Sequence, residues 1–81
     1  MKDLVEHIVK ALVDHPEEVS INETVGETVI ILEISTSPDD VGKVIGKDGR
    51  IANAIRTVVK AAAARKDRKV TVEIMARKQV A

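Results

Sequence analysis

Two glycines three residues apart, Gly46 and Gly49, constrain this chain most, because they lie between two stretches with helical patterns. Glycine adopts backbone angles that residues with a β-carbon resist, and it lets the backbone of another molecule come close. A helix is predicted directly after the pair, so its free N–H groups and the positive end of its dipole favour an anion there, typically a phosphate. Lys47 and Arg50 add positive charge at the same place. The loop is therefore predicted to clamp the phosphates of a nucleic-acid strand.

Charge is separated along the sequence, although the formal net charge is zero. Residues 1–40 contain two basic and ten acidic residues, whereas residues 43–69 contain nine basic and two acidic residues. This separation predicts one face that attracts polyanions and another that does not. The alternative is that the basic residues only keep helix surfaces soluble.

Length and composition restrict the class of protein. With 81 residues, the chain is expected to form one small domain with a modest core. It contains no Cys, which excludes disulfides, thiolate metal sites and a Cys nucleophile. No apolar stretch reaches the ~18 residues that a membrane-spanning helix needs, and the N-terminus lacks the apolar segment of a secretion signal. We therefore expect a cytoplasmic protein that does not insert into a membrane.

The hydrophobic pattern predicts the order helix, strand, strand, helix, loop, helix, strand. Asp3 is the expected N-cap of the first helix and Ser37 that of the second. Gly26-Glu27 is typical of a two-residue hairpin turn. The predicted ranges are, in order, 3–14, 19–25, 28–35, about 38–45, the Gly46–Gly49 loop, about 50–65 and 70–76, with a loose tail over 77–81.

This order of elements predicts an α+β fold. The stretch 28–35 is almost continuously apolar, which is typical of a central strand that is covered more fully than its neighbours. Two helices connect it to the strand over 70–76, so a right-handed parallel crossover is expected. We predict a three-stranded mixed sheet, with 28–35 antiparallel to 19–25 and parallel to 70–76, and with all three helices on one face.

The helix expected over 50–65 has more apolar surface than one core requires. Its apolar positions cover an arc of roughly 200°, wider than the stripe of about 100° that faces a core. The surplus is either alanine that favours helix formation or a surface for a partner. In the second case, the candidate dimer contacts are Ile55, Val58, Val59 and Ala62.

The segment Ile45-Gly46-Lys47-Asp48-Gly49 resembles the I-G-x-x-G core of KH domains, and the order of elements resembles the type II, bacterial form. Over about residues 3–76 the chain is similar to the KhpA family of small single-KH bacterial RNA-binding proteins. The resemblance implies a type II KH fold (α-β-β-α-α-β), with a single KH domain over 1–81.

The resemblance implies binding of single-stranded RNA, or of DNA, by a loop that clamps the backbone of about four nucleotides while the bases lie in an apolar groove. By position, the two glycines would give close backbone approach, and Lys47 and Arg50 would contact phosphate or sugar. The strand over 28–35 would help to line the groove. The candidate nucleic-acid-binding residues are Val41, Lys43, Ile45, Gly46, Lys47, Asp48, Gly49, Arg50, Asn53 and Arg56.

The resemblance also implies a role as an RNA chaperone or post-transcriptional regulator, with links to cell-shape control. It implies partnership with KhpB, a larger multidomain KH protein. The alternative is a protein-interaction module that forms a homodimer, or a heterodimer with KhpB, and whose partner supplies most of the RNA binding.

Two features of the sequence predict weak binding by one copy. Asp48 places an acid where a second basic residue would help, and its role is either to cap the long helix or to contact the ligand. The chain has no Phe, Tyr or Trp, so it lacks the stacking platforms that contribute ~1–3 kcal/mol per base in many single-strand binders.

A nucleotide-binding P-loop is the nearest enzyme-like motif, but the spacing excludes it. Three residues separate Gly42 from Gly46 where the motif needs four, and Asp48 replaces the Ser or Thr that ligates Mg²⁺.

Other polar residues do not form a recognisable site in the sequence. His7 and His15 lie eight residues apart with no third ligand converging on them, so both are expected at the surface. Asp39 and Asp40 are explained by their place in a first helical turn, where acids complement the dipole. No catalytic residue, metal or cofactor is expected, and the protein is not expected to be an enzyme.

Overall fold

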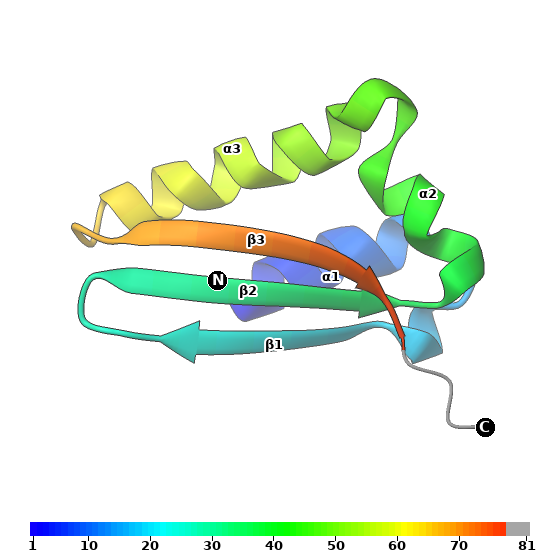
Figure 1. Ribbon diagram of the computed structural model, residues 1–81, viewed down its shortest axis with the longest axis horizontal. Coiled ribbons are helices and arrows are strands. Elements are labelled where there is room, and N and C mark those ends of the chain that lie inside the picture. The colour runs from blue at the N-terminus through cyan, green and yellow to red at the C-terminus, as the bar shows by residue number, and fades with distance from the viewer. Residues whose placement is uncertain (78–81) are drawn as a thin grey trace.

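The computed structural model describes residues 1–77, and its elements follow the predicted order (Figure 1). Short 3-10 turns precede β1 and α2, and a third joins α2 to α3; they occupy Pro16–Glu18, Pro38–Asp40 and Lys47–Gly49. The helices are α1 (Lys2–Leu12), α2 (Val41–Ile45) and α3 (Arg50–Ala64), and the strands are β1 (Ser20–Val25), β2 (Val29–Thr36) and β3 (Lys69–Ala76). None of the helices within residues 1–77 has both the length and the apolar character needed to span a bilayer.

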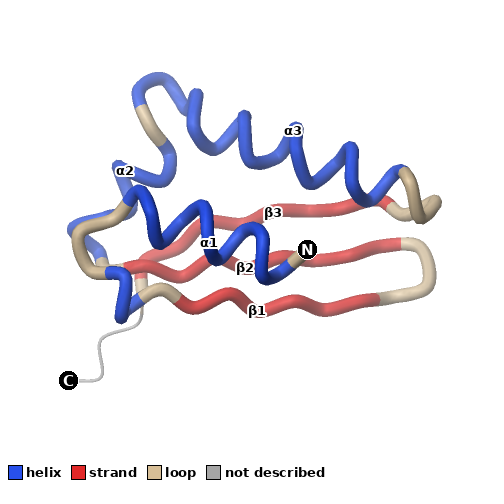
Figure 2. Tube along the Cα trace, turned by 180° about the vertical axis from the view of Figure 1, so that it is seen from behind, coloured by secondary structure: helices blue, strands red, loops and turns tan. Residues whose placement is uncertain are grey.

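The three strands form one mixed sheet in the order β1-β2-β3. The central strand β2 is antiparallel to β1, with Ile30 opposite Val25, and parallel to β3, with Ile30 opposite Val70. All three helices lie on one face of the sheet, and α3 runs along β3 (Figures 1 and 2). The predicted α+β architecture is therefore confirmed.

The core lies between the sheet and the helices. Alternate residues of β2 point into it, and Leu32 and Ile34 are fully buried. Burying such a side chain stabilises the fold by about 1.5–3 kcal/mol. The opposite face of the sheet is uncovered, and Ile31 on that face is 36% exposed. β2 is buried more fully than β1 and β3, as predicted, but only on the face that packs against the helices.

Several predicted ends of elements are wrong by one or two residues. α1 begins at Lys2 with Met1 at its N-cap, so Asp3 lies inside the first turn instead of capping it. Ser37 occupies the predicted cap position, but its side chain makes no capping hydrogen bond within residues 1–77. The hairpin turn is shifted by one residue from the predicted Gly26-Glu27, because the N–H of Gly26 donates to the carbonyl of Val29 at 2.7 Å and leaves Glu27 and Thr28 at the turn.

The predicted tail falls largely outside the described residues. Residues 78–81 lie beyond them. The N–H of Arg77 donates to the carbonyl of Thr36 at 2.6 Å, so the backbone at this position is attached to the sheet. The pairing of β2 with β3 thus extends to the last described residue.

Candidate nucleic-acid interface

The loop between α2 and α3 has an unusual backbone. Gly46 ends α2 with φ 76° and ψ 173°, and Gly49 precedes α3 with φ 74° and ψ 13°. Between them, Asp48 also has a positive φ of 56°. Such angles suit glycine and are tolerated by Asp more readily than by most residues. The sequence Gly-Lys-Asp-Gly therefore allows a tight reversal that most residues would strain.

The two glycines are needed for different reasons. A Cβ at Gly46 would lie 2.6 Å from Cγ1 of Ile51, so the first residue of the loop packs closely on α3. A Cβ at Gly49 would meet only Nδ2 of Asn53, at 3.9 Å. Gly46 thus fixes the loop against the protein itself, whereas Gly49 leaves space for another molecule.

The tip of the loop is open to solvent. Lys47, Asp48 and Arg50 are exposed, and both glycines are partly exposed. None of the three charged side chains forms an ion pair with another of residues 1–77. The loop is neither covered by other elements nor part of a regular helix, so its backbone is accessible to a ligand.

Of the two roles considered for Asp48, capping of α3 is excluded by the structure. Gly49 occupies the N-cap, and no side chain among the described residues makes a capping hydrogen bond there. The positive φ at this position accounts for the presence of Asp, because Asp is one of the few residue types that adopt a left-handed conformation at modest cost. Its carboxylate remains exposed beside Lys47 and reduces the positive charge of the loop.

A groove lies between α3 and β3. It is lined by Arg56 and Lys60 of α3 and by Val70, Thr71 and Val72 of β3. Asn53, Arg56 and Lys60 recur at three- and four-residue spacing, so they share one side of the helix. The side chain of Arg56 donates from Nη1 to Oδ1 of Asn53 at 3.2 Å.

The strand that borders this groove is β3, which lies at the edge of the sheet beside α3, whereas β2 is central. That the stretch 28–35 helps to line the site for the bases stays a prediction. The crossover from β2 through both helices places β3 in that position. Sequence analysis therefore missed Val70, Thr71 and Val72, and it left Lys60 out although Lys60 lies four residues after Arg56 on the same helix side.

The other three predicted contact residues come from α2. Ile45 at its end is 37% exposed, and Val41 is partly buried. Lys43 is engaged elsewhere, because its Nζ is paired with the Asp14 carboxylate and lies 3.6 Å from Oδ1 of Asp40. The hydrogen bond to Asp14 raises the pKa of Lys43 above its ordinary value. The charge of Lys43 is thus largely neutralised within the protein.

Asp40 is a buried structural residue that sequence analysis explained only by the helix dipole. Its side chain is fully buried and accepts the backbone N–H groups of Asp14 at 3.2 Å and of His15 at 3.0 Å. Burial would raise the pKa of Asp40, but these two hydrogen bonds and nearby positive charge outweigh it, so that the pKa lies below its ordinary value. Asp40 connects the chain after α1 to the beginning of α2, the helix that leads into the loop.

The opposite side of α3 is apolar. A hollow of about 280 Å³ lies between α1 and α3, lined mainly by Ile8, Leu12, Ile51, Ala54 and Val58. Val58 is 45% exposed, whereas Ile55 and Val59 are 3% and 1% exposed and belong to the core. Ile55 and Val59 were therefore wrongly predicted as dimer contacts. Of the four, Val58 and the partly buried Ala62 remain accessible.

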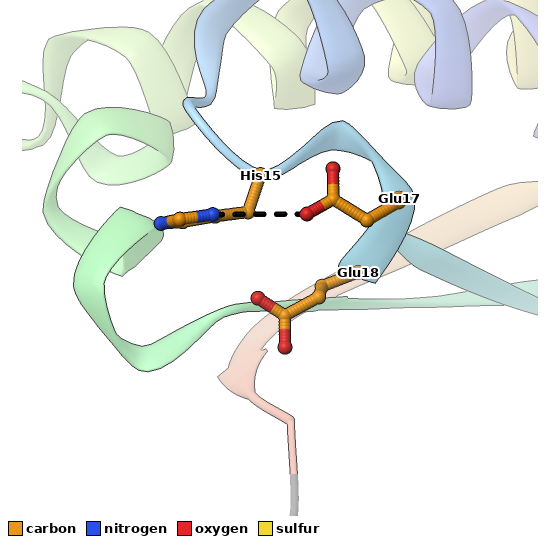
Figure 3. A group of neighbouring side chains, drawn as sticks. All are labelled: His15, Glu17 and Glu18. Atoms are coloured by element: carbon orange, nitrogen blue, oxygen red, sulfur yellow. Dashed lines mark ion pairs between the residues drawn. The ribbon is translucent and has the colours of Figure 1, made fainter.

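One group of side chains was not expected from the sequence. His15, Glu17 and Glu18 have ligand atoms that all lie within 4.8 Å of one another (Figure 3). Nδ1 of His15 lies 3.7 Å from Oε1 of Glu17, whose side chain is 70% exposed. The group sits at the 3-10 turn before β1, whose backbone brings residues 15, 17 and 18 together, and the sequence does not show this turn.

Comparisons with known proteins agree with this architecture. The KH-domain model of the KhpA/KhpB family matches residues 2–74. The protein named RNA-binding protein KhpA of Clostridium perfringens (strain 13 / Type A) is 65% identical over 75 residues, which are 93% of this chain and 100% of that protein. The protein of the same name from Chlamydia pneumoniae is 47% identical over 78 residues, which are 96% of this chain and 100% of that protein.

A solved structure shares the fold. The crystal structure of Era in complex with MgGDPNP and nucleotides 1506–1542 of 16S ribosomal RNA has a TM-score of 0.61 and 18% identity to this chain. The likeness covers 93% of this chain and 29% of that of Era, so it concerns one part of the larger protein. Together with the element order, it confirms the type II KH fold, and the chain belongs to the KhpA/KhpB family of KH domains.

Proposed function

We propose that this protein binds single-stranded RNA and that the Gly46–Gly49 loop clamps the RNA backbone. The observation that carries the proposal is the exposed, left-handed turn of the loop, with the cations Lys47 and Arg50, which form no ion pair with another of residues 1–77. Backbone N–H groups at the start of α3, together with these charges, favour phosphate. Gly49 leaves room for the backbone of the ligand.

From the loop, the strand would follow α3 into the groove. Asn53 and Arg56 offer hydrogen-bond donors along its edge, and Ile45, which is 37% exposed, offers aliphatic surface to the bases. Aliphatic contact discriminates weakly between bases, so we expect low sequence selectivity. We also expect one copy to bind weakly, because it has no aromatic residue for stacking.

The relatives support this proposal, since they are named RNA-binding proteins. We propose that this protein is a binding module and not an enzyme, and that it acts as an RNA chaperone or post-transcriptional regulator. Its family includes both KhpA and KhpB domains, so a KhpB-type protein is the partner that we propose for it.

Replacing Lys47 tests the clamp. Lys47→Asp places two adjacent acids opposite the phosphates, so it should abolish most binding of an unstructured eight-nucleotide RNA in a fluorescence-anisotropy titration. Lys2→Asp is the matched control, because it makes the same charge change on α1 at an exposed position. Equal affinity of parent and Lys47→Asp would overturn the clamp. Equal weakening by both variants would show that only net charge matters.

A second candidate function, self-association through α3, is favoured by the exposed face of this helix. Ala54, Val58 and Ala61 are exposed and recur at four- and three-residue spacing, so they form one narrow stripe. Small residues on both sides of Val58 allow another helix to approach closely. We propose a second copy of this chain as the occupant, since two such stripes can pair about a twofold axis.

Val58→Asp is the probe for this second function. It should convert a dimer to a monomer in sedimentation while circular dichroism shows the fold retained. Glu27→Asp, on the hairpin loop, is the control for a harmless change of an exposed residue. An unchanged mass for Val58→Asp relative to a dimeric parent, or a monomeric parent, would exclude α3 as a contact between copies.

A further inference from the structure

We propose a second phosphate-binding site at the far end of the groove, formed by Lys60 of α3 and by Arg68 and Lys69 at the start of β3. We call it the turn site. It deepens the proposed function, on which it rests, because it lengthens the bound RNA beyond the four nucleotides that a KH loop clamps. Its ligand is the backbone of the same single strand.

The shape of the surface supports a continuous path. The groove between the middle of α3 and β3 is lined by Arg56, Lys60 and residues 70–72. A second hollow, of about 350 Å³, shares Lys60, Val70 and Thr71 with it and continues to Arg68 and Lys69. Because the two hollows share three residues, a strand that leaves the first enters the second.

The charges of this surface are free to bind an anion. Within residues 1–77, no ion pair involves Arg56, Lys60, Arg68 or Lys69. In contrast, Lys43 is paired with Asp14. The acid of the turn, Asp67, does not line either hollow.

The backbone holds the turn site in place. The N–H of Arg68 donates to the carbonyl of Ala63 at 3.0 Å, and the N–H of Lys69 donates to the carbonyl of Thr28 at 2.9 Å. The turn is thus attached both to the end of α3 and to the residue before β2. Because the backbone of Arg68 and Lys69 is held in place, ordering their side chains on a ligand costs less conformational entropy.

The distance between the loop and the turn site sets the length of the ligand. The loop lies at one end of α3 and the turn at the other (Figure 1). α3 has 15 residues, and at 1.5 Å per residue it is roughly 22 Å long. A stacked strand that rises about 3.4 Å per nucleotide covers this length in roughly six nucleotides. We therefore expect affinity to rise as the RNA lengthens from four to about eight nucleotides.

Paired variants test the turn site. Arg68→Gln/Lys69→Gln removes two charges from it, and Arg65→Gln/Lys66→Gln removes two charges from the same turn at positions that do not line the hollow. Each is titrated with four- and eight-nucleotide oligouridylate, with folding checked by circular dichroism. Since each phosphate contact on a single strand contributes about 0.7 to the salt slope, losing two contacts should weaken binding of the eight-mer on the order of tenfold at 0.1 M salt. The slope should fall by about 1.4, and the four-mer should bind as before.

Three outcomes would overturn the turn site: equal affinity of the parent for both lengths, equal weakening of the eight-mer by both double variants, or equal loss for the four-mer and the eight-mer. Should Arg68→Gln/Lys69→Gln fail to fold, Lys60→Gln is subject to the same criteria. Lys47→Asp separates this inference from the proposed function. A loss of both oligonucleotides with Lys47→Asp, without a length effect in the parent, leaves the clamp standing and removes the turn site. A length effect in the parent, with binding of both oligonucleotides unchanged by Lys47→Asp, removes the clamp.

Discussion

The carboxylate of Asp40 accepts the backbone N–H of His15 at 3.0 Å, across 25 positions of the sequence. The same carboxylate accepts the N–H of Asp14, and it lies at the N-cap of α2. One buried side chain therefore joins the end of the first helix to the helix that leads into the Gly46–Gly49 loop. The position of the loop relative to the rest of the fold depends on this junction.

Asp40→Asn should lower the melting temperature by several degrees at neutral pH. An amide has one acceptor oxygen, so one of the two N–H groups would be left unsatisfied in a buried place. Because the folded pKa of Asp40 is depressed, its contribution is present above the ordinary value of 3.8 and is lost as pH falls through the lower folded pKa. Thermal melts of parent and variant between pH 2 and pH 7 measure this difference.

Asp39→Asn provides the control, since Asp39 is adjacent and exposed. It should leave the melting temperature nearly unchanged. The melting temperatures of parent and Asp40→Asn should become equal as the pH falls toward 2. A gap that stays constant across this pH range, or a larger effect of Asp39→Asn, would contradict the role of the buried carboxylate.

Gly46→Ala should destabilise the protein more than Gly49→Ala. Both glycines have positive φ, but only at Gly46 would the new Cβ collide, at 2.6 Å from Ile51. Backbone strain and overpacking together predict a loss of roughly 2–4 kcal/mol at Gly46, against roughly 1 kcal/mol at Gly49. Urea unfolding of both variants gives the two values. A larger loss of stability for Gly49→Ala than for Gly46→Ala would show that Gly46 does not pack closely on Ile51.

Ile55→Ala and Val58→Ala should separate the core side of α3 from its exposed side. Ile55 is 3% exposed and Val58 is 45% exposed. We expect a loss of about 2–5 kcal/mol for Ile55→Ala and less than about 0.5 kcal/mol for Val58→Ala. Unfolding is measured at low protein concentration, so that self-association does not contribute. Similar losses of stability for both variants would show that α3 does not turn Ile55 toward the core and Val58 toward solvent.

Sequence patterns predicted the order of elements and the mixed sheet because each strand and helix has its own periodicity. They could not set the rotation of α3, whose alanines widen the apolar arc to roughly 200°. Ile55 and Val59 were consequently assigned to the surface although they are buried. Their packing against the sheet distinguishes them from Val58.

Contacts between distant parts of the chain escaped prediction for a related reason. The bonds from Asp14 and His15 to Asp40 join segments that no local pattern connects. The part that β3 plays in the groove beside α3 was not predicted, because the sequence does not show which strand edge faces the helix. The loop itself was predictable, since two glycines at this spacing between two helices leave few backbone geometries.

The most direct test of RNA clamping by the Gly46–Gly49 loop is a ¹⁵N–¹H NMR titration of the labelled protein with an unlabelled single-stranded RNA. We predict that the largest shifts occur at the amides of Gly46 to Arg50, with smaller shifts along the groove face of α3 and at the start of β3. Saturating shifts confined to α1 and β1, with the amides of residues 46–50 unchanged, would contradict an RNA-clamping role for the loop.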